Sequence, residues 1–208
     1  VDFNLNSTLH PTSGNWNNIN SFAVSTPISL VDDLGYSSAI QVAITDNFSQ
    51  SNELGASQPS GTIIFPATAL KDAVYGDNTN PIGVITLTGL NVDKIYSFEI
   101  FGSRKEVTDN RETQYTVTGS SPQSVTLNPS SNASLTSQIV DIAPTPNGTL
   151  TLTVAKGSNN DNSSGFYYLN ALKLKERNVV IPDVLLDCED GTTNKLAVLN
   201  VFSNGPGQ

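Results

Sequence analysis

The chain has almost none of the residues on which common catalytic and metal centres depend. Its 208 residues include one cysteine, one histidine, one tryptophan and no methionine. Cys188 has no second cysteine to pair with, so an intrachain disulfide and a cysteine metal cluster are excluded, and we expect it to be a small buried hydrophobic residue. His10 stands alone, and neither a G-x-S-x-G nor an H-E-x-x-H motif occurs, so Ser/His hydrolysis and zinc catalysis lack their parts.

Charge is also scarce, and its balance is acidic. Charged residues make up 14% of the chain, against about 25% in typical domains. The formal net charge is −9 and the pI is near 4.3, which argues against binding to nucleic acid or anionic lipid through bulk electrostatics. No apolar run approaches the ~18 residues of a membrane span. We therefore expect no nucleic-acid partner and no membrane insertion.

One catalytic alternative remains, a pair of carboxylates that hydrolyses glycosides. It requires the fold to bring two acidic residues together in a cleft. The candidates are Asp32, Asp33, Asp72, Asp109 and Glu112. No further motif supports such a pair, so the sequence favours a protein that is not itself an enzyme, although it can be attached to a glycoside-active one.

The residues that are abundant favour strands. β-branched and apolar residues alternate at a period of two along many short segments, separated by turns rich in Gly, Pro, Asn and Ser. This pattern predicts an all-β fold, an antiparallel β-sandwich, with helical tendency only at residues 67–75. The predicted strands are residues 1–6, 28–31, 40–45, 62–65, 84–87, 95–101, 113–117, 124–127, 137–142, 148–154 and 167–174.

The composition changes near Lys175, where a more charged stretch precedes a new apolar run. We expect a β-sandwich over residues 1–176. Residues 177–208 are too few for a hydrophobic core of their own. They are predicted to be a linker and the start of a second, truncated module.

The few charges gather in one loop. Two amphipathic segments, 95–104 and 109–118, are predicted to be strands joined by a loop that carries Arg104 and Arg111 with Glu106, Asp109 and Glu112. Such arginines could clamp hydroxyl groups or the carboxylate of an acidic sugar. The alternative is an ion-pair network that fixes the hairpin.

Several segments resemble a known fold family. Residues 96–104 with 111–117, then 148–154, then 168–174, are similar in this order to the last strands of galactose-binding-like jelly rolls, which include carbohydrate-binding module families 6 and 35 and the malectin-like domains. Residues 13–19, 65–69, 89–91 and 109–113 also resemble a module of bacterial surface polysaccharide-utilisation proteins. The resemblance covers residues 1–176.

The resemblance implies a jelly roll that binds a glycan or polysaccharide, secreted or at the bacterial cell surface, with other domains of a larger protein as partners. In these families an Asn at the start of the final strand hydrogen-bonds sugar hydroxyls, and Asn170 occupies that place. Asn170 shares a strand face with Leu172 and Leu174, so its inward amide must find polar partners, either a ligand or loop backbone.

A sugar site also needs a flat aromatic ring and planar polar groups. Trp16 in its Asn-rich loop is a candidate platform, with Tyr75 and Tyr167 as lesser ones, and the alternative for Trp16 is core or loop packing. The predicted ligand-binding residues are Trp16, Tyr75, Arg104, Asn110, Arg111, Glu112 and Asn170.

A structural Ca²⁺ near the first and last strands is a further expectation of the resemblance. Oxygen-bearing side chains are dense in residues 77–80 and 159–165. Neither stretch has the EF-hand spacing, and both also suit simple turns, so no ligand set is assigned.

Two functions therefore stay open at this point. The first is non-catalytic carbohydrate binding, and the second is a structural spacer or adhesin domain that supports a neighbouring domain. An exposed Trp16, with Arg104, Arg111 and Asn170 converging on one groove, favours binding. A buried Trp16 with paired arginines favours the spacer.

Overall fold

The computed structural model describes residues 1–4, 11–61, 63–179, 185–189 and 194–198. The chain divides into two compact units, Val1–Arg177 and Asn178–Gln208. In the second unit β15 (Leu185–Glu189) and β16 (Asn194–Val198) form an antiparallel pair. The predictions for His10 and for the side chain of Cys188 lie outside the described residues. Among the helices that are described, none is long and apolar enough to cross a membrane.

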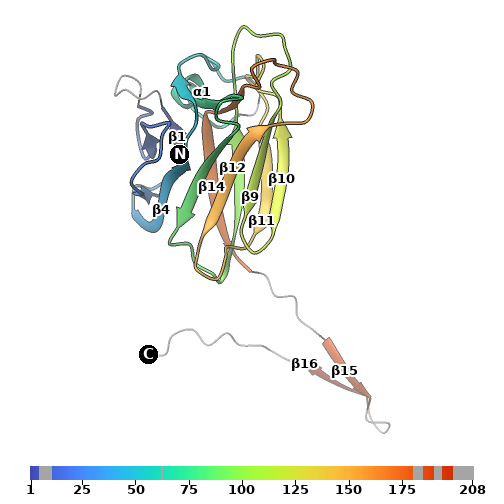
Figure 1. Cartoon of the computed structure of the whole chain (residues 1–208). Coiled ribbons are helices and arrows are strands. Elements are labelled where there is room, and N and C mark those ends of the chain that lie inside the picture. The colour runs from blue at the N-terminus through green and yellow to red at the C-terminus, as the bar shows by residue number, and fades with distance from the viewer. Residues whose placement is uncertain (5–10, 62, 180–184, 190–193, 199–208) are drawn as a thin grey trace. The chain divides into compact units, whose positions relative to one another are not determined.

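The first unit is a β-sandwich with two main sheets (Figure 1). One sheet has the order β11 (Ser137–Ile142), β8 (Lys94–Phe101), β14 (Ala171–Asn178), β1 (Asp2–Phe3) and β2 (Asn18–Ile19). The other has the order β10 (Pro122–Leu127), β9 (Thr113–Thr118), β12 (Leu150–Lys156), β7 (Ile82–Thr88), β4 (Ser37–Asp46) and β3 (Ile28–Val31). The pairs β11–β8, β14–β1, β10–β9, β9–β12, β12–β7, β7–β4 and β4–β3 run antiparallel, and β1 and β2 run parallel. The predicted all-β class and antiparallel sandwich of jelly-roll type are confirmed.

A third, small sheet lies beside the two main ones, in the order β13 (Tyr167–Leu169), β6 (Ala73–Gly76) and β5 (Gln50–Asn52). The helix α1 (Ala67–Lys71) precedes β6. In Figure 1, α1 lies at the same end of this unit as the long loops that follow β8 and β12.

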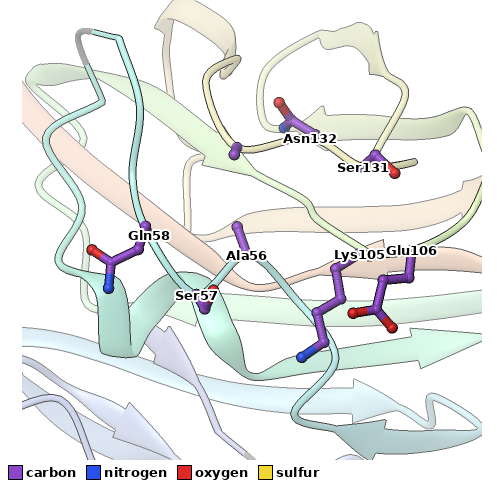
Figure 2. Close-up of a pocket in the computed structure, with 8 residues that line it drawn as sticks. Ala56, Ser57, Gln58, Lys105, Glu106, Ser131 and Asn132 are labelled. Carbon is purple, nitrogen blue, oxygen red and sulfur yellow. The ribbon is translucent and has the colours of Figure 1, made fainter.

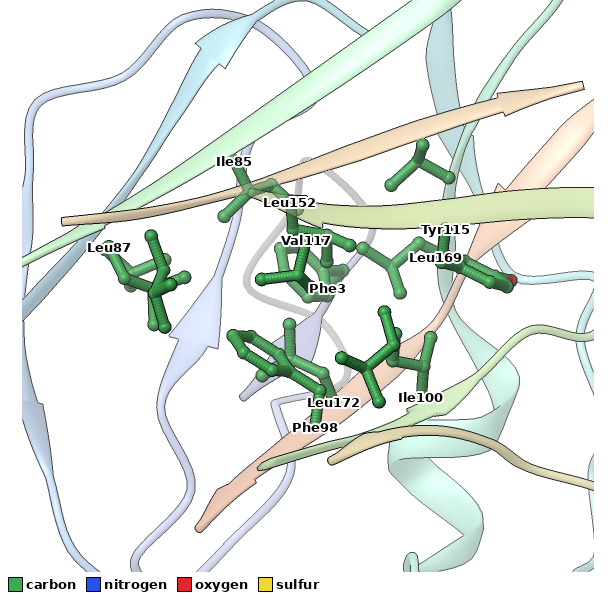
Figure 3. Packing of buried hydrophobic residues seen from close by; sticks show 14 of the residues in the cluster. Phe3, Ile85, Leu87, Phe98, Ile100, Tyr115, Val117, Leu152, Leu169 and Leu172 are labelled. Atoms are coloured by element: carbon green, nitrogen blue, oxygen red, sulfur yellow. The ribbon is translucent and has the colours of Figure 1, made fainter. Parts of the chain in front are cut away.

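The core forms because alternate residues of each strand face inward. In β12, Leu150, Leu152 and Val154 are buried while Thr151 and Thr153 lie on the outer face. Strands of both main sheets contribute to the same apolar cluster, as Figure 3 shows for Ile85, Phe98 and Leu172, among others. Side chains from both sheets thus share one dry layer, which is why the period of two was readable in the sequence.

Two short segments differ from the sequence prediction. Residues 63–65 of the strand predicted at 62–65 are not in a strand, and Phe65 instead packs in a separate apolar cluster with Leu70 and Phe101. The helix predicted at 67–75 ends at Lys71, and β6 replaces its second half. Val74 there enters the main core, so burial in a sheet outweighs the weak local preference for helix.

The segments 95–104 and 109–118 do not form the predicted hairpin. β8 belongs to one main sheet and β9 to the other, so residues 102–112 cross from one layer to the other. Tyr96 and Phe98 therefore share the core with Tyr115 and Val117 from the opposite sheet. The predicted strand at 167–174 is also divided, because Asn170 separates β13 from β14.

Shortening Leu152 to alanine tests the shared core. Leu152 is fully buried, so Leu152→Ala is expected to lower the free energy of unfolding by about 2–5 kcal/mol in urea denaturation. Thr153→Ala, the next residue on the outer face of β12, is the control and is expected to change it by less than about 0.5 kcal/mol. Equal losses in the two variants would contradict the assigned facing of β12.

Candidate functional site

The small sheet aligns three polar or aromatic side chains on one face. Tyr75 of β6 stands opposite both Gln50 of β5 and Tyr168 of β13. Directly opposed residues on neighbouring strands point to the same side, while the adjacent Val74 enters the core. Gln50 is exposed and Tyr75 is partly exposed, so this row reaches the protein surface.

Three aromatic rings meet at this row, and we call them the aromatic platform: Tyr75, Phe166 and Tyr168. The ring centroids of Tyr75 lie 5.7 Å from those of both Phe166 and Tyr168, and Phe166 lies 6.4 Å from Tyr168. Tyr168 is only 2% exposed, whereas Tyr75 and Phe166 are partly exposed. The platform therefore rests on Tyr168 and offers its two other rings to solvent.

Arg111 braces the platform from within. Its guanidinium carbon lies 5.2 Å from the centroid of Phe166 and 5.8 Å from that of Tyr168. Its Nη1 donates to Tyr168 Oη (2.6 Å) and its Nε to Asp109 Oδ2 (2.9 Å). Only 11% of the side chain is exposed. Because these contacts are all internal, Arg111 holds the rings in place.

Electrostatics around Arg111 agree with this role. The hydrogen bond from Arg111 lowers the pKa of Asp109 below its usual range, and a further bond from Asn162 acts in the same direction. Burial raises the pKa of Tyr168, although the nearby arginines oppose the rise. At neutral pH the pair is therefore an arginine cation beside an ionised aspartate, and Tyr168 is a neutral phenol.

Arg104 lies close to two of the same rings, Tyr75 and Tyr168. Its Nη1 donates to the carbonyl oxygen of Lys105 (2.8 Å), and in the described part of the chain it forms no ion pair. Burial raises the pKa of Tyr75, Asp77 adds to the rise, and the charge of Arg104 opposes it. Arg104 thus places a cation without an ion-pair partner beside the platform.

Asn110 and Glu112 fasten two loops together. Asn110 N donates to Asp161 Oδ1 (2.7 Å), and the Glu112 carboxylate accepts from both Asn159 N (2.9 Å) and Asn159 Nδ2 (3.0 Å). These bonds hold residues 157–162, and the same loop leads to Phe166. Both residues were predicted as ligand contacts, and the structure places them in loop contacts that position the platform.

Asn170 is fully buried at the break between β13 and β14. Its Oδ1 accepts from Ser103 N (2.7 Å) and its Nδ2 donates to the carbonyl oxygen of Leu70 (2.9 Å). Of the two partners considered for this amide, the structure shows loop backbone. Asn170 is therefore a positioning residue. It holds the backbone of Ser103, which directly precedes Arg104 in the chain.

Trp16 lies apart from the platform. It is partly buried, with its ring 6.0 Å from Phe65 in an edge-on arrangement. The flanking Asn17 pairs with both the N–H and the carbonyl oxygen of Val31 (2.8 Å each). Trp16 lines a groove of about 850 Å³ whose apolar floor includes Leu30 and Leu172.

Tyr167, the other aromatic considered, is a core residue. It is fully buried, and its hydroxyl donates to the carbonyl oxygen of Asn80 (2.8 Å). The structure thus matches neither expected pattern in full. The pattern for binding was an exposed Trp16 with Arg104, Arg111 and Asn170 converging on one groove. The pattern for a spacer was a buried Trp16 with paired arginines. Tyr75, Arg104 and Arg111 come together around Tyr168, while Trp16 is elsewhere and Asn170 lies beneath.

The two stretches with many oxygen-bearing side chains, residues 77–80 and 159–165, contain turns, which was one of the two alternatives for them. Asp77 Oδ1 accepts from Thr79 N and Asn80 N, and Asn162 Oδ1 accepts from Ser164 N and Phe166 N. Their oxygen atoms are engaged by backbone donors, as in Asx turns.

A different place fits a hard cation better. Asp2 is fully buried in β1, and neither of its carboxylate oxygens accepts a hydrogen bond from the described residues. Thr12 lies close enough to lower the pKa of Asp2, but its hydroxyl and its N–H donate to Thr68 and Asn18. Asn4, just after β1, is also buried, and its Oδ1 accepts no hydrogen bond from the described residues.

Among the described residues, the positive group that acts on the Asp2 carboxylate is the N-terminal amine of Val1, whose own pKa burial lowers to about 5. Burial raises the pKa of Asp2 to about 7, and the nearby buried Asp72 adds to the rise. No group of three or more His, Cys, Asp or Glu side chains in the described ranges could hold a metal, so a cation here needs amide or carbonyl oxygens as well. Such mixed oxygen sets are what Ca²⁺ accepts, and the residues present fit it.

Replacing Asn170 tests its positioning role. Asn170→Ala leaves the N–H of Ser103 and the carbonyl of Leu70 buried without partners, so the free energy of unfolding is expected to fall by about 2–4 kcal/mol. Gln114→Ala, an exposed amide on β9, is the control for urea denaturation. A loss no larger than in the control would show that the two backbone groups find other partners.

The comparisons with known proteins concern the fold. No protein-family model and no curated protein matches the chain. A solved family 61 carbohydrate-binding module in complex with β-1,4-galactotriose is similar at 14% identity, with a TM-score of 0.38, over 67% of this chain and 90% of the module. A family 35 carbohydrate-binding module from an environmental isolate is similar at 16% identity, with a TM-score of 0.32, over 78% of this chain and 95% of the module. Both are likenesses of fold at low sequence identity.

Proposed function

We propose that the unit Val1–Arg177 binds a neutral carbohydrate on the aromatic platform, without catalysis. The observation that carries this proposal is the pair of partly exposed rings, Tyr75 and Phe166, beside the guanidinium of Arg104. A pyranose has an apolar C–H face that packs on an aromatic ring and hydroxyls that need directional partners. The platform supplies the first and Arg104, with the exposed amide of Gln50, supplies the second.

The charge around the platform favours a neutral sugar over an acidic one. Arg111, the expected clamp for a carboxylate, is already bonded to Asp109. Asp77 lies close enough to raise the pKa of Tyr75, and the chain carries a net charge of −9. An anionic sugar would therefore meet one cation without an ion-pair partner within an acidic field.

We further propose that the natural ligand is a polysaccharide met outside the cell, at the cell surface or in secreted form, by a larger protein that includes this unit. The support is compositional. The chain is poor in charge and rich in Asn, Ser and Thr, and its exposed strand faces carry hydroxyl groups such as the hydrogen-bonded pair Thr116 and Ser124.

The spacer function has two observations in its favour. Trp16 is partly buried against Phe65, and Arg111 is paired with Asp109. Neither observation accounts for the exposed rings of Tyr75 and Phe166, which a spacer has no need to present.

Carbohydrate binding can be tested by affinity electrophoresis and calorimetry with galactan, mannan, xylan and β-glucan as probes. Tyr75→Ala and Phe166→Ala are each expected to weaken binding roughly tenfold or more, because each removes a stacking ring. Tyr36→Ala is the matched control, since Tyr36 is 71% exposed and lies outside the platform. If no probe retards the wild-type protein, the spacer function stands; if Tyr36→Ala alone weakens binding, the site is elsewhere.

We also propose that Asp2, with Asn4 and the nearby Asp72, takes part in binding a structural Ca²⁺. A buried carboxylate whose oxygens accept no hydrogen bond is costly unless a cation compensates it. Asp2 lies in β1, which joins β14 to β2, so a cation there would tie the first strand to the loop and helix that flank it.

Thermal unfolding with and without calcium tests this site. Adding CaCl₂ at about 100 times its Kd is expected to raise Tm by roughly 5–10 °C at pH 8. In EDTA, stability is expected to fall as pH rises from about 4 to 7, because the fold favours the protonated form of Asp2, whose pKa is raised from 3.8 to about 7. Asp2→Asn should abolish both responses, and an unchanged calcium response in Asp2→Asn would refute the assignment.

A further inference from the structure

A small cleft lies among three loops, one of which continues directly from Arg104. It has a volume of about 230 Å³ and is lined by residues 56–58, 105–106 and 131–133. Figure 2 shows these three segments around the cleft, with Gln58 on one side and Lys105 and Glu106 on another. No aromatic ring lines it, so it differs in kind from the platform.

The cleft and the platform are built on the same two backbone segments. Residue 104 pairs with residue 130 in an isolated parallel bridge, and Ser131 N donates to the carbonyl oxygen of Arg104 (2.8 Å). Arg104 acts on the platform rings, and Ser130 Oγ donates to the carbonyl oxygen of Asp109 (2.6 Å). The next residue in each segment, Lys105 and Ser131, lines the cleft. Arg104 is thus close to the platform rings, while the residue that follows it lines the cleft.

The backbone of the cleft is held in a strained conformation. Three residues other than glycine have positive φ among the described residues, and two of them, Glu106 (59°) and Ser131 (52°), line this cleft. This left-handed region is unfavourable for residues with a Cβ. Ser131 is kept there by its own bonds, with Oγ donating to the carbonyl oxygen of Val107 (2.8 Å). Strain of this kind persists where the surroundings fix it and is concentrated at ligand sites.

The floor of the cleft is fixed by buried hydrogen bonds. Asn132 is 7% exposed and its Nδ2 donates to the carbonyl oxygens of Gly102 (2.8 Å) and Leu135 (2.9 Å). Ser103 Oγ donates to the carbonyl oxygen of Asn132 (2.6 Å) and accepts from Ala56 N (3.0 Å). All three walls are thereby tied to one buried network, so the cleft exists before any ligand arrives.

We propose that this cleft is a second subsite that binds another unit of the same neutral glycan chain whose first unit stacks on the platform. The inference rests on the proposed function. The rim offers an ammonium from Lys105, a carboxylate from Glu106 and an amide from Gln58. This mixture of donors and acceptors with opposite charges suits hydroxyl groups and gives no net preference for an ionic ligand. The protein then recognises a stretch of chain instead of a single sugar.

Calorimetry with oligosaccharides of increasing length tests the subsite. The probes are β-1,4-linked gluco-, manno-, xylo- and galacto-oligosaccharides of two to six units. Wild-type affinity is expected to rise about tenfold once the chain reaches the cleft, as two or three added hydrogen bonds imply. The double variant Gln58→Ala/Lys105→Ala should lose this rise and keep its affinity for the shortest ligand that binds. The control is Gln138→Ala/Lys175→Ala, which removes an exposed Gln and Lys from β11 and β14.

Glu106→Gly examines the same cleft without endangering the fold. Glycine adopts a φ near 59° without strain, so Tm is expected not to fall, while the gain with chain length is expected to shrink. If both cleft variants keep the full gain while Tyr75→Ala abolishes binding, the subsite is refuted and the platform stands. If the wild-type protein binds no probe of any length, the proposed function and the subsite fail together.

Discussion

The buried amide of Asn170 is the constraint on which the functional end of the sandwich depends. Its two hydrogen bonds tie the loop at Ser103 to the last turn of α1 at Leu70. Gly55 approaches this amide so closely that a Cβ there would lie 2.5 Å from Asn170 Nδ2, so a third segment is fixed against the same group. Three segments distant in sequence, two loops and the end of α1, are thus joined by one side chain. Because its polar atoms are sealed from water, a shift of any loop would leave a buried group unpaired, which is costly.

The two arginines near the platform have different roles. Arg111 is bonded to Asp109 and Tyr168 and lies against two rings, so its charge is used to stabilise the platform. Arg104 has no ion-pair partner among the described residues. Arg111 suits a place inside the ring cluster, because a planar guanidinium loses little freedom on packing. Arg104, which is partly exposed, is the arginine that remains available at the surface. Arg104 and the adjacent Lys105 both lack an ion-pair partner among the described residues, in a chain whose net charge is −9. This balance is why the ligand proposed above carries no net charge.

Most strands of the fold could be predicted from the sequence because each has one buried and one exposed face. The bounds of β3 and β11 agree with the predicted 28–31 and 137–142. The alternation of apolar and polar residues shows which face of a strand is buried but not which strand it pairs with. The sequence therefore predicts a hairpin where β8 and β9 in fact belong to different sheets. The same limit applies to the site. The inward direction of Asn170 followed from its spacing with Leu172, whereas its partners Ser103 and Leu70 depend on long-range contacts that leave no local pattern.

The residues that the sequence did not identify share one property, which is that their environment comes from distant segments. Phe166 gains its importance from Tyr75 and Arg111, and Asp2 from its burial near Asp72. A lone acidic residue in a short strand and a phenylalanine after a Gly-containing turn are both ordinary in sequence. Their roles arise only when folding removes water from the carboxylate and gathers the rings around one guanidinium. A surface built this way can change its outermost groups while Asn170, Tyr168 and Arg111 keep the frame. This separates the residues that maintain the platform from the exposed rings on which the proposed ligand would stack.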